Sequence, residues 1–447
     1  MFRIRWILPC LLVACAAPPA GFTSRLGSWD EAAAAHPGPD VARRLELSDD
    51  ADLDELIRFA SLNNAGLRAA VQRWRAALEQ VPQAVSLPDP KLMLGLMVRE
   101  VETRVGPMGP SIAISQAFPW FGTLEAAGGR AFELAEAERE TVEAVRLDVV
   151  RRVREAYYEA AWLEAALAIA NRHRELITQW EGVARSSYAS GEGSQADVLR
   201  AQVELGLSVD KVQRLTELRR PLRGQLNAAL GRSANTPMPP LRPVFNDPPE
   251  IDEQALLSEL PQTNPALRAM ARRVDAAGHG IELAEKESLP SFVLGLDYTF
   301  IDDAAMPGVS GSGDDALEVQ LGLELPIYRG RVQAGIAQAR ARQSAARGEA
   351  ADAGHRLGAE LELALFELHD ADRRVALYRH TLVPKGAEAL RATAGSYRAG
   401  DARFVEIIDT LKTMHEFQLG VARAQSDRAQ ALAWVEALTG ITFLGDT

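Results

Sequence analysis

The side chains able to do chemistry in this 447-residue chain form no catalytic pattern. The sequence contains no Gly-x-Ser-x-Gly turn for an activated serine, no phosphate-binding glycine loop and no His-Glu-x-x-His pair for zinc. The histidines match no metal-ligand spacing, and each is expected to be an isolated surface side chain: His36, His173, His279, His355, His369, His380 and His415. We therefore expect no enzyme, no metal site and no cofactor.

Both cysteines, Cys10 and Cys15, lie in an N-terminal segment with the features of a targeting signal. Arg3 and Arg5 form a basic start, and residues 6–13 form a short apolar stretch. The letters LVAC that end at Cys15 resemble the lipobox of bacterial lipoproteins, in which the cysteine becomes the lipid-modified first residue of the mature chain. The alternative is an ordinary signal peptide with an incidental cysteine.

A lipid on Cys15 would leave the mature chain without a thiol for a disulfide or a metal. Ala16 stands where an Asp would favour retention in the inner membrane, so the resemblance implies an outer-membrane destination. The longest apolar run is the one in this segment, and it is too short for a spanning helix.

Composition indicates a folded protein that does not bind nucleic acid. Hydrophobic residues make up 47% of the chain, which is typical of a folded protein. The formal net charge of -12 excludes nucleic acid as a partner, because phosphate-binding surfaces collect Lys and Arg.

The chain contains one unit used twice, with its landmarks in the same order. The second copy has a longer loop between its two strand-like segments, at 302–315 against 101–110. The matching segments are NNAGLRAA (63–70) with TNPALRAM (263–270), LPDPKLMLGL (87–96) with ESLPSFVLGL (287–296), and YASGEGSQADVL (188–199) with YRAGDARFVEII (397–408).

The repeat sets the expected domains. A signal peptide precedes a lipidated extension, the two copies of the repeat flank a proline-rich strap, and a short tail ends the chain. The signal peptide is 1–14, the extension 15–50, the first repeat 51–231, the strap 232–262, the second repeat 263–440 and the tail 441–447. Strands are expected at about 91–101 and 111–118 in the first repeat and at about 291–300 and 317–325 in the second.

The strand-like segments alternate between apolar and small or acidic residues. The clearest is 317–325, where every second residue from Leu317 to Leu325 is apolar and Glu318, Gln320 and Glu324 lie between them. Alternation over about nine to eleven residues is typical of outer-membrane barrel strands. The alternative is half of a soluble sandwich.

Long helices argue against the sandwich. No proline interrupts the helical pattern from Leu124 to about Ser186, which corresponds to a helix of roughly 95 Å. Two shorter helices laid end to end would flank it, and the second half repeats the pattern. The expected partners are 51–85 and 194–231, and the second-half helices are 264–286, 331–395 and 401–439.

Nearly the whole mature chain resembles a TolC-like outer-membrane efflux protein. The motifs that carry the resemblance are Asn-Pro-Ala-Leu at 264–267, Gln-Ala-Phe-Pro-Trp-Phe-Gly at 116–122, and two Tyr-x-x-Gly turns followed by Asp-Val-Leu at 197–199 and Glu-Ile-Ile at 406–408. The resemblance implies an α+β membrane protein whose long helices form an α-barrel. It also implies a homotrimer, because four strands per chain cannot close a barrel and TolC-like proteins share twelve among three chains.

The strand ends mark the expected junction between barrel and tunnel. Proline cannot donate to a strand ladder and its φ suits a helix start. Aromatic rings beside it suit a membrane interface, with ordinary helix-entry packing as the alternative. The junction residues are Pro119, Trp120 and Gly122 in the first repeat and Pro326, Tyr328 and Gly330 in the second.

The two Tyr-x-x-Gly turns, at Tyr188 and Tyr397, mark the expected periplasmic end. In TolC-like proteins acidic residues shortly after these turns narrow the entrance. The ninth residues after the tyrosines are Asp197 and Glu406, and Asp409 lies one helical turn later. The alternative is that they are helix-start carboxylates favoured by the dipole. The family's basic residue at the second turn is replaced by Ala402, with an arginine beside it.

The resemblance implies a passive export duct for small molecules or ions. Its partners would be a periplasmic adaptor, an inner-membrane pump of the resistance-nodulation-division type, and outer-membrane lipid. The alternatives are the outer-membrane component of a type I protein-secretion system and, in a different class, a periplasmic coiled-coil lipoprotein without a channel.

Overall fold

A computed structural model gives the fold of two compact units, each described by itself. The described residues are 17–35, 47–48, 51–99, 101–238, 241, 245, 247 and 249–443. The first unit takes its described residues from 1–31, 71–140 and 268–352, and the second from 32–70, 141–267 and 353–447.

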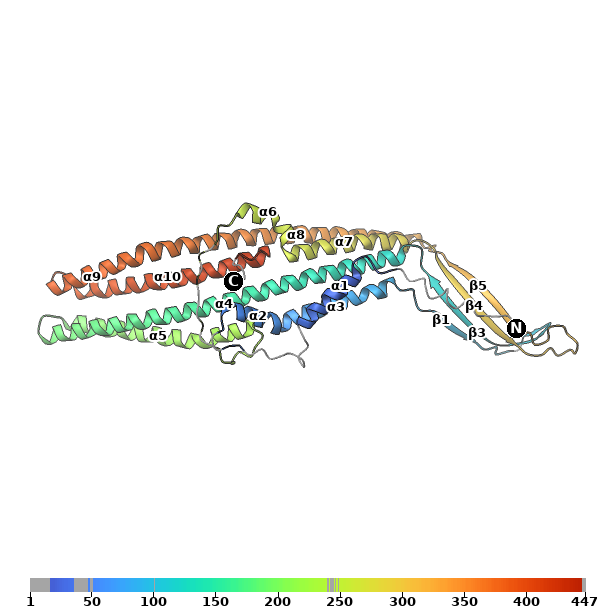
Figure 1. Ribbon diagram of the computed structural model, residues 1–447, viewed down its shortest axis with the longest axis horizontal. Helices are drawn as coiled ribbons and strands as arrows, with labels where there is room; N and C mark the ends of the chain where they lie inside the picture. The colour runs from blue at the N-terminus through green and yellow to red at the C-terminus, as the bar shows by residue number, and fades with distance from the viewer. Residues whose placement is uncertain are drawn as a thin grey trace. The chain divides into compact units, whose positions relative to one another are not determined.

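An antiparallel sheet with the order β1-β3-β4-β5 forms one part of the first unit (Figure 1). A short strand, β2, pairs with one end of β3. The strands are β1 (Lys91–Gly95), β2 (Glu102–Thr103), β3 (Gly106–Phe118), β4 (Ser291–Ile301) and β5 (Ala316–Glu324).

The strand register turns the sequence alternation into two different faces. Ile114 of β3 pairs with Leu296 of β4, which pairs with Val319 of β5, so apolar side chains form a continuous row. The neighbouring row contains Ser115, Gly295 and Gln320. Successive strand residues point to opposite sides of a sheet, so one face is apolar and the other is small or polar.

Helices complete the first unit. α1 (Phe22–Ala35) is fixed by two of its side chains. Arg25 pairs with Glu136 at 2.7 Å, and Trp29 donates through Nε1 to the carbonyl of Val71 at 3.2 Å while Arg75 lies 4.4 Å above its ring. The other helices that contribute are α3 (Ala65–Val85), α4 (Thr123–Ala189), α7 (Pro265–Lys286) and α8 (Arg329–Leu377).

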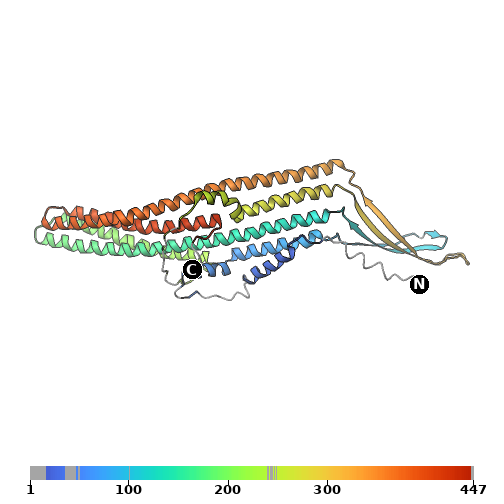
Figure 2. The same cartoon turned by 45° about the horizontal axis from the view of Figure 1, so that its top comes forward.

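The second unit is helical and contains two long hairpins. α5 runs back along α4, and α10 runs back along α9, in both views (Figures 1 and 2). Beside the remaining parts of α4 and α8, its elements are α2 (Leu53–Asn63), α5 (Gln195–Ala229), α6 (Glu253–Thr263), the π-helix η2 (Tyr378–Leu382), α9 (Val383–Ala399) and α10 (Phe404–Thr439).

An asparagine caps the same helix start in each repeat. The Oδ1 atom of Asn64 accepts from the Leu67 N–H at 3.1 Å, and that of Asn264 accepts from the Leu267 N–H at 3.0 Å. The amide of Asn264 also donates to the Leu438 carbonyl at 2.7 Å. In each repeat the asparagine of Asn-x-x-Leu is therefore the N-cap of the following helix, and the preceding helix ends at this residue.

Parts of the proline-rich segment pack on the second unit. Phe245 stacks on Tyr158 with ring centroids 5.6 Å apart. Arg428 of α10 is 4% exposed, and it pairs with Asp247 at 3.1 Å and Asp372 at 2.8 Å. A buried guanidinium needs such partners, so this segment is fixed to α10 and α8.

Some elements differ from the expected ranges. The strand expected at 91–101 ends at Gly95. The helix expected at 331–395 is interrupted by η2, directly before Pro384. Proline has no N–H to donate, and a wider π turn accommodates that missing hydrogen bond.

In the part of the chain that the structure describes, no helix combines the length and the apolar character of a membrane span.

Candidate functional site

Both Tyr-x-x-Gly turns end a helix by the same hydrogen-bonded motif. The Gly191 N–H donates to the Tyr188 carbonyl at 3.1 Å, and the Gly400 N–H donates to the Tyr397 carbonyl at 3.1 Å. These glycines have φ values of +81° and +87°, in the left-handed region. A second bond encloses the first, one residue further out on each side: the N–H of Glu192 donates to the Ser187 carbonyl and that of Asp401 to the Ser396 carbonyl, both at 2.9 Å.

These paired bonds form the Schellman motif, which explains the spacing of the repeated letters. The glycine must lie three residues after the tyrosine because it takes the left-handed position that closes the helix. The tyrosine contributes its carbonyl to the turn, so its ring is left to pack or to face solvent.

The carboxylates after the turns occupy equivalent positions. Asp197 and Glu406 are each the third residue of their helix, α5 and α10. Ser194 accepts from the Asp197 N–H at 3.2 Å and donates to its carboxylate at 2.7 Å. Glu406 instead accepts from Nε of Arg403 at 3.2 Å. Asp197 therefore takes part in a helix cap, whereas Glu406 pairs with the arginine beside Ala402.

Glu406 and Asp409 lie on one exposed face of α10. The side chain of Glu406 is 46% exposed and that of Arg403 is 82% exposed, so their ion pair is open to solvent. Asp409 is also exposed and lines a cavity of about 420 Å³ together with Lys385 of α9. This face therefore presents two carboxylates one helical turn apart, with Arg403 paired to Glu406 and Lys385 beside Asp409.

A shared apolar core holds the ends of the two hairpins together. It is built from Ile177 and Ala184 of α4, Ala201 of α5, and Phe404 and Ile407 of α10, among others. This packing holds the starts of α5 and α10 in place, and with them the carboxylates that follow the turns.

The two turn tyrosines differ in their surroundings. Tyr397 packs edge-on against Trp180 and Phe404, with ring centroids 5.8 and 5.9 Å apart, whereas Tyr188 is 50% exposed. The tyrosine ring is therefore a core residue at one turn and a surface residue at the other.

The first junction is a packed corner. Pro119 directly follows β3, and Trp120 stacks on Phe292 of β4 with ring centroids 5.7 Å apart. Gly122 has a φ of +82° directly before α4. Phe121 is 77% exposed. Trp120 therefore packs on the sheet and Phe121 is the more exposed ring, and a place of either ring at a membrane interface stays a prediction.

The second junction is built differently. Pro326 lies two residues after β5, and Tyr328 is 72% exposed. Gly330 lies inside the first turn of α8, in an ordinary right-handed conformation with open space around it. The two glycines of the repeat are therefore not equivalent, because only Gly122 takes a left-handed conformation.

The expectation of isolated surface histidines is wrong for two of them. The rings of His173 in α4 and His415 in α10 stack 4.3 Å apart, and His415 is 6% exposed. They lie 242 residues apart in the sequence, so no local spacing reveals the pair.

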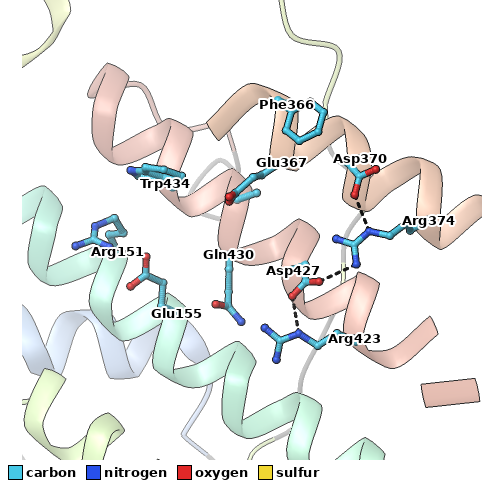
Figure 3. A pocket seen from close by; sticks show the side chains of 11 residues that line it. Arg151, Glu155, Phe366, Glu367, Asp370, Arg374, Arg423, Asp427, Gln430 and Trp434 are labelled. Atoms are coloured by element: carbon cyan, nitrogen blue, oxygen red, sulfur yellow. Dashed lines mark hydrogen bonds and ion pairs between the residues drawn. The ribbon is translucent and has the colours of Figure 1, made fainter. Parts of the chain in front are cut away.

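A charged cavity of about 620 Å³ lies among α4, α8 and α10 (Figure 3). Arg374 lies between Asp370 and Asp427, at 2.8 and 3.0 Å, and Arg423 pairs with Asp427 at 2.7 Å. Arg423 also pairs with Glu159 of α4 at 2.8 Å. The carboxylates that line the cavity are paired with guanidinium groups, and these ion pairs join α4, α8 and α10.

Two further results bear on the sequence expectations. Among the described residues, no group of three or more His, Cys, Asp or Glu side chains is placed to hold a metal ion. Cys15, the expected lipidation site, lies outside the described residues.

The fold matches solved outer-membrane channels. The outer-membrane channel OprN aligns with a TM-score of 0.75 at 18% identity, covering 88% of this chain and 90% of that one. One helical hairpin from each repeat and an antiparallel sheet assembled from both repeats thus define the class of TolC-like channel folds.

The sequence comparisons give the family. The model described as outer membrane efflux protein matches residues 56–232 and 256–441, and the chain therefore belongs to the outer membrane efflux protein family. The pyoverdine export outer membrane protein OpmQ of Pseudomonas putida is 23% identical over 95% of this chain and 92% of its own length. Protein CyaE of Bordetella pertussis is 27% identical over 70% of this chain, which spans 66% of CyaE.

Proposed function

We propose that three copies of this chain form an export duct of a tripartite efflux pump. The observation that carries the proposal is the open sheet of the first unit. Its edge strands, β1 and β5, are exposed at every residue.

An open edge of this kind requires another strand. Unpaired backbone N–H and C=O groups are not tolerated in lipid, and four strands are too few to enclose a lumen. The β1 edge of one copy is therefore available to the β5 edge of the next. Three copies would give the twelve-strand barrel of TolC-like proteins.

The two faces of the sheet suit such a barrel. Leu317, Val319 and Leu321 are 59%, 65% and 85% exposed on one face, where lipid would cover them. Ser115, Gly295 and Gln320 form a row on the other face, which would line the lumen. Burial of the apolar row stabilises the assembly by about 25 cal/mol for each Å² removed from water.

The duct would narrow at the Tyr-x-x-Gly turns. Threefold symmetry makes a ring of like charge from each of Glu406 and Asp409, and Asp197 adds a third ring behind its cap. Such rings concentrate cations and repel anions at a constriction. The exposed acidic face of α10 supports this assignment.

The partners would be a periplasmic adaptor and an inner-membrane pump of the resistance-nodulation-division type. The Pro-Trp-Phe-Gly strand end and the lipobox-like LVAC support this choice of pump. The cargo would be small molecules or ions. Cys15 would carry a lipid that anchors the chain to the outer membrane.

Conductance in planar lipid bilayers tests the duct. Purified full-length protein should insert and give discrete single-channel steps, with a mass in detergent corresponding to three chains. A protein that assembles but gives no conductance under any tested voltage would instead be a coiled-coil lipoprotein without a channel. Export of an unfolded polypeptide rather than small molecules in reconstituted cells would favour the secretion alternative.

A further inference from the structure

A buried pair of histidines joins α4 to α10 in the second unit. The rings of His173 and His415 stack 4.3 Å apart with an interplanar angle of 21°. His415 is 6% exposed, and in the described part of the chain neither of its ring nitrogens has a hydrogen-bond partner. A buried polar ring without such partners lowers the stability of the fold, so its presence calls for an explanation.

After burial, Lys211 of α5 is the charged group that lowers the pKa values of both histidines. Glu204 of α5 raises the pKa of His173 and Lys412 of α10 lowers it. These two charges largely offset each other, because the Glu204 carboxylate lies 2.5 Å from Nζ of Lys412.

Further charged groups act on Lys211 itself. Burial lowers the pKa of Lys211, Arg214 on the same helix lowers it further, and Glu416 of α10 raises it. No charged group of α9 contributes to these shifts among the described residues. A proton on either ring would thus join an environment that already holds positive charge.

The neutral form of the pair is therefore the one that the fold favours. Burial, then His173 and Lys211, lowers the pKa of His415 from 6.5 to about 4. Burial is also the main cause of the lowered pKa of His173. Since an unfolded or separated histidine titrates near 6.5, the packed arrangement binds fewer protons below that pH. Its stability is full above about pH 6.5 and falls as the pH drops toward 4.

We propose that His173 and His415 form an acid-sensitive contact that holds α10 against α4 when both rings are neutral and releases it when they are protonated. Two stacked imidazolium rings would repel each other and Lys211 in a poorly hydrated site. Protonation therefore drives the helices apart instead of being neutralised by a partner.

The contact lies close enough to the end of the hairpin for a change in helix packing there to reach Glu406. His415 lies nine residues after Glu406, about 14 Å along α10. The π-helix η2 lies directly before α9 and packs on α10. The ring of its Tyr378 lies so close to Gly420 of α10 that a Cβ on that glycine would be 2.7 Å from Cε1. Interrupted helical bonding at η2 gives the hairpin a point at which to bend. An effect on the entrance rests on the proposed function; the acid-sensitive contact itself does not.

The pKa values can be measured on the unmodified protein. Exchange of the imidazole C2 hydrogen for deuterium, followed by mass spectrometry across pH 4 to 9, gives a pKa for each histidine. We expect a pKa of about 4 for His415 and a pKa below 6.5 for His173. Values near 6.5 for both members of the pair would overturn the proposal.

Amide exchange tests the release. With exchange times corrected for the intrinsic effect of pH, the protection of residues 404–415 should fall at least tenfold between pH 7.5 and 5.0, while residues 430–439 of the same helix change little. The double variant His173→Phe with His415→Phe keeps two stacked rings without a titrating group, and its protection should not change. The matched control, His355→Phe, alters an exposed histidine of α8 and should behave as the wild type does.

Equal loss of protection in the double variant and the wild type would contradict the proposal, as would unchanged protection in the wild type. If the double variant fails to assemble, the pKa measurement on the wild-type protein decides. Neither readout requires conductance, so failure of the export duct and failure of the acid-sensitive contact are distinguishable.

Discussion

Nζ of Lys412 in α10 lies 2.5 Å from Oε1 of Glu204 in α5, and the glutamate side chain is only 13% exposed. This ion pair joins the two hairpins close to their shared core. It differs from the pair between Lys385 and Glu388, which is 73% and 56% exposed and lies within a single helix.

The difference in burial predicts that the two ion pairs differ in their coupling energy. In double-mutant cycles with Lys412→Met and Glu204→Gln, we expect a coupling energy of about 1 kcal/mol or more, because the glutamate is largely desolvated. The matched cycle with Lys385→Met and Glu388→Gln should give about 0–0.5 kcal/mol. Denaturant unfolding of the solubilised protein measures both, and equal couplings would show that the hairpins do not depend on this pair.

The capping asparagines provide a second prediction. Asn264→Ala should cost about 2–4 kcal/mol, because it removes an N-cap and leaves the carbonyl of Leu438 without its 2.7 Å donor. Asn64→Ala should cost about 1 kcal/mol, since its amide reaches the Ala229 carbonyl only at 3.5 Å. Unfolding free energies of the two variants should differ in this order, and the reverse order would refute the assigned hydrogen bonds.

A third prediction separates the two junction glycines. Gly122→Ala should destabilise by about 1–2 kcal/mol, because its φ of +82° is unfavourable for any residue with a Cβ. Gly330→Ala lies in a helix with open space around it and should be neutral or stabilise by up to about 1 kcal/mol. Thermal midpoints of the assembled protein measure the difference. Similar losses in both variants would mean that the junctions share one conformation.

The anchor gives a fourth prediction. Cys15→Ser should abolish labelling by a radioactive fatty acid, because the thiol is the expected acceptor of the lipid. The variant should still reach the outer membrane if the apolar face of the sheet inserts by itself. Cys10→Ser, within the signal segment, is the control and should keep the label. Fatty-acid labelling that persists in Cys15→Ser would exclude this lipidation site.

The sequence was most informative where the pattern is local or repeated. Alternation predicts strands at 291–300 and 317–325, and the structure has strands at 291–301 and 316–324. Apolar spacing without proline predicts one helix from Leu124 to about Ser186, and α4 runs from 123 to 189. These features depend on neighbouring residues, whose periodicity the sequence shows directly.

Features that depend on distant residues were not predictable. The stacking of His173 on His415 and the pairing of Glu204 with Lys412 join helices that lie far apart along the chain. Gly122 and Gly330 also take different conformations, and they are not at equivalent positions, since Gly122 lies three residues after Pro119 and Gly330 four residues after Pro326. The positions of the entrance carboxylates relative to a threefold axis depend on neighbouring copies, so they stay a prediction.

The entrance is tested most directly by single-channel recording of Glu406→Ala with Asp409→Ala. These carboxylates are expected to narrow the entrance, so replacing them with alanine should widen it and raise single-channel conductance. Because a ring of carboxylates also concentrates cations, its removal should lower cation selectivity and weaken block by divalent ions added from the periplasmic side. The control, Glu349→Ala with Asp352→Ala, removes two carboxylates at the same spacing from α8 and should leave all three properties close to those of the wild type. Unchanged conductance, selectivity and block in a properly assembled Glu406→Ala, Asp409→Ala protein would contradict the assignment of these residues to the entrance.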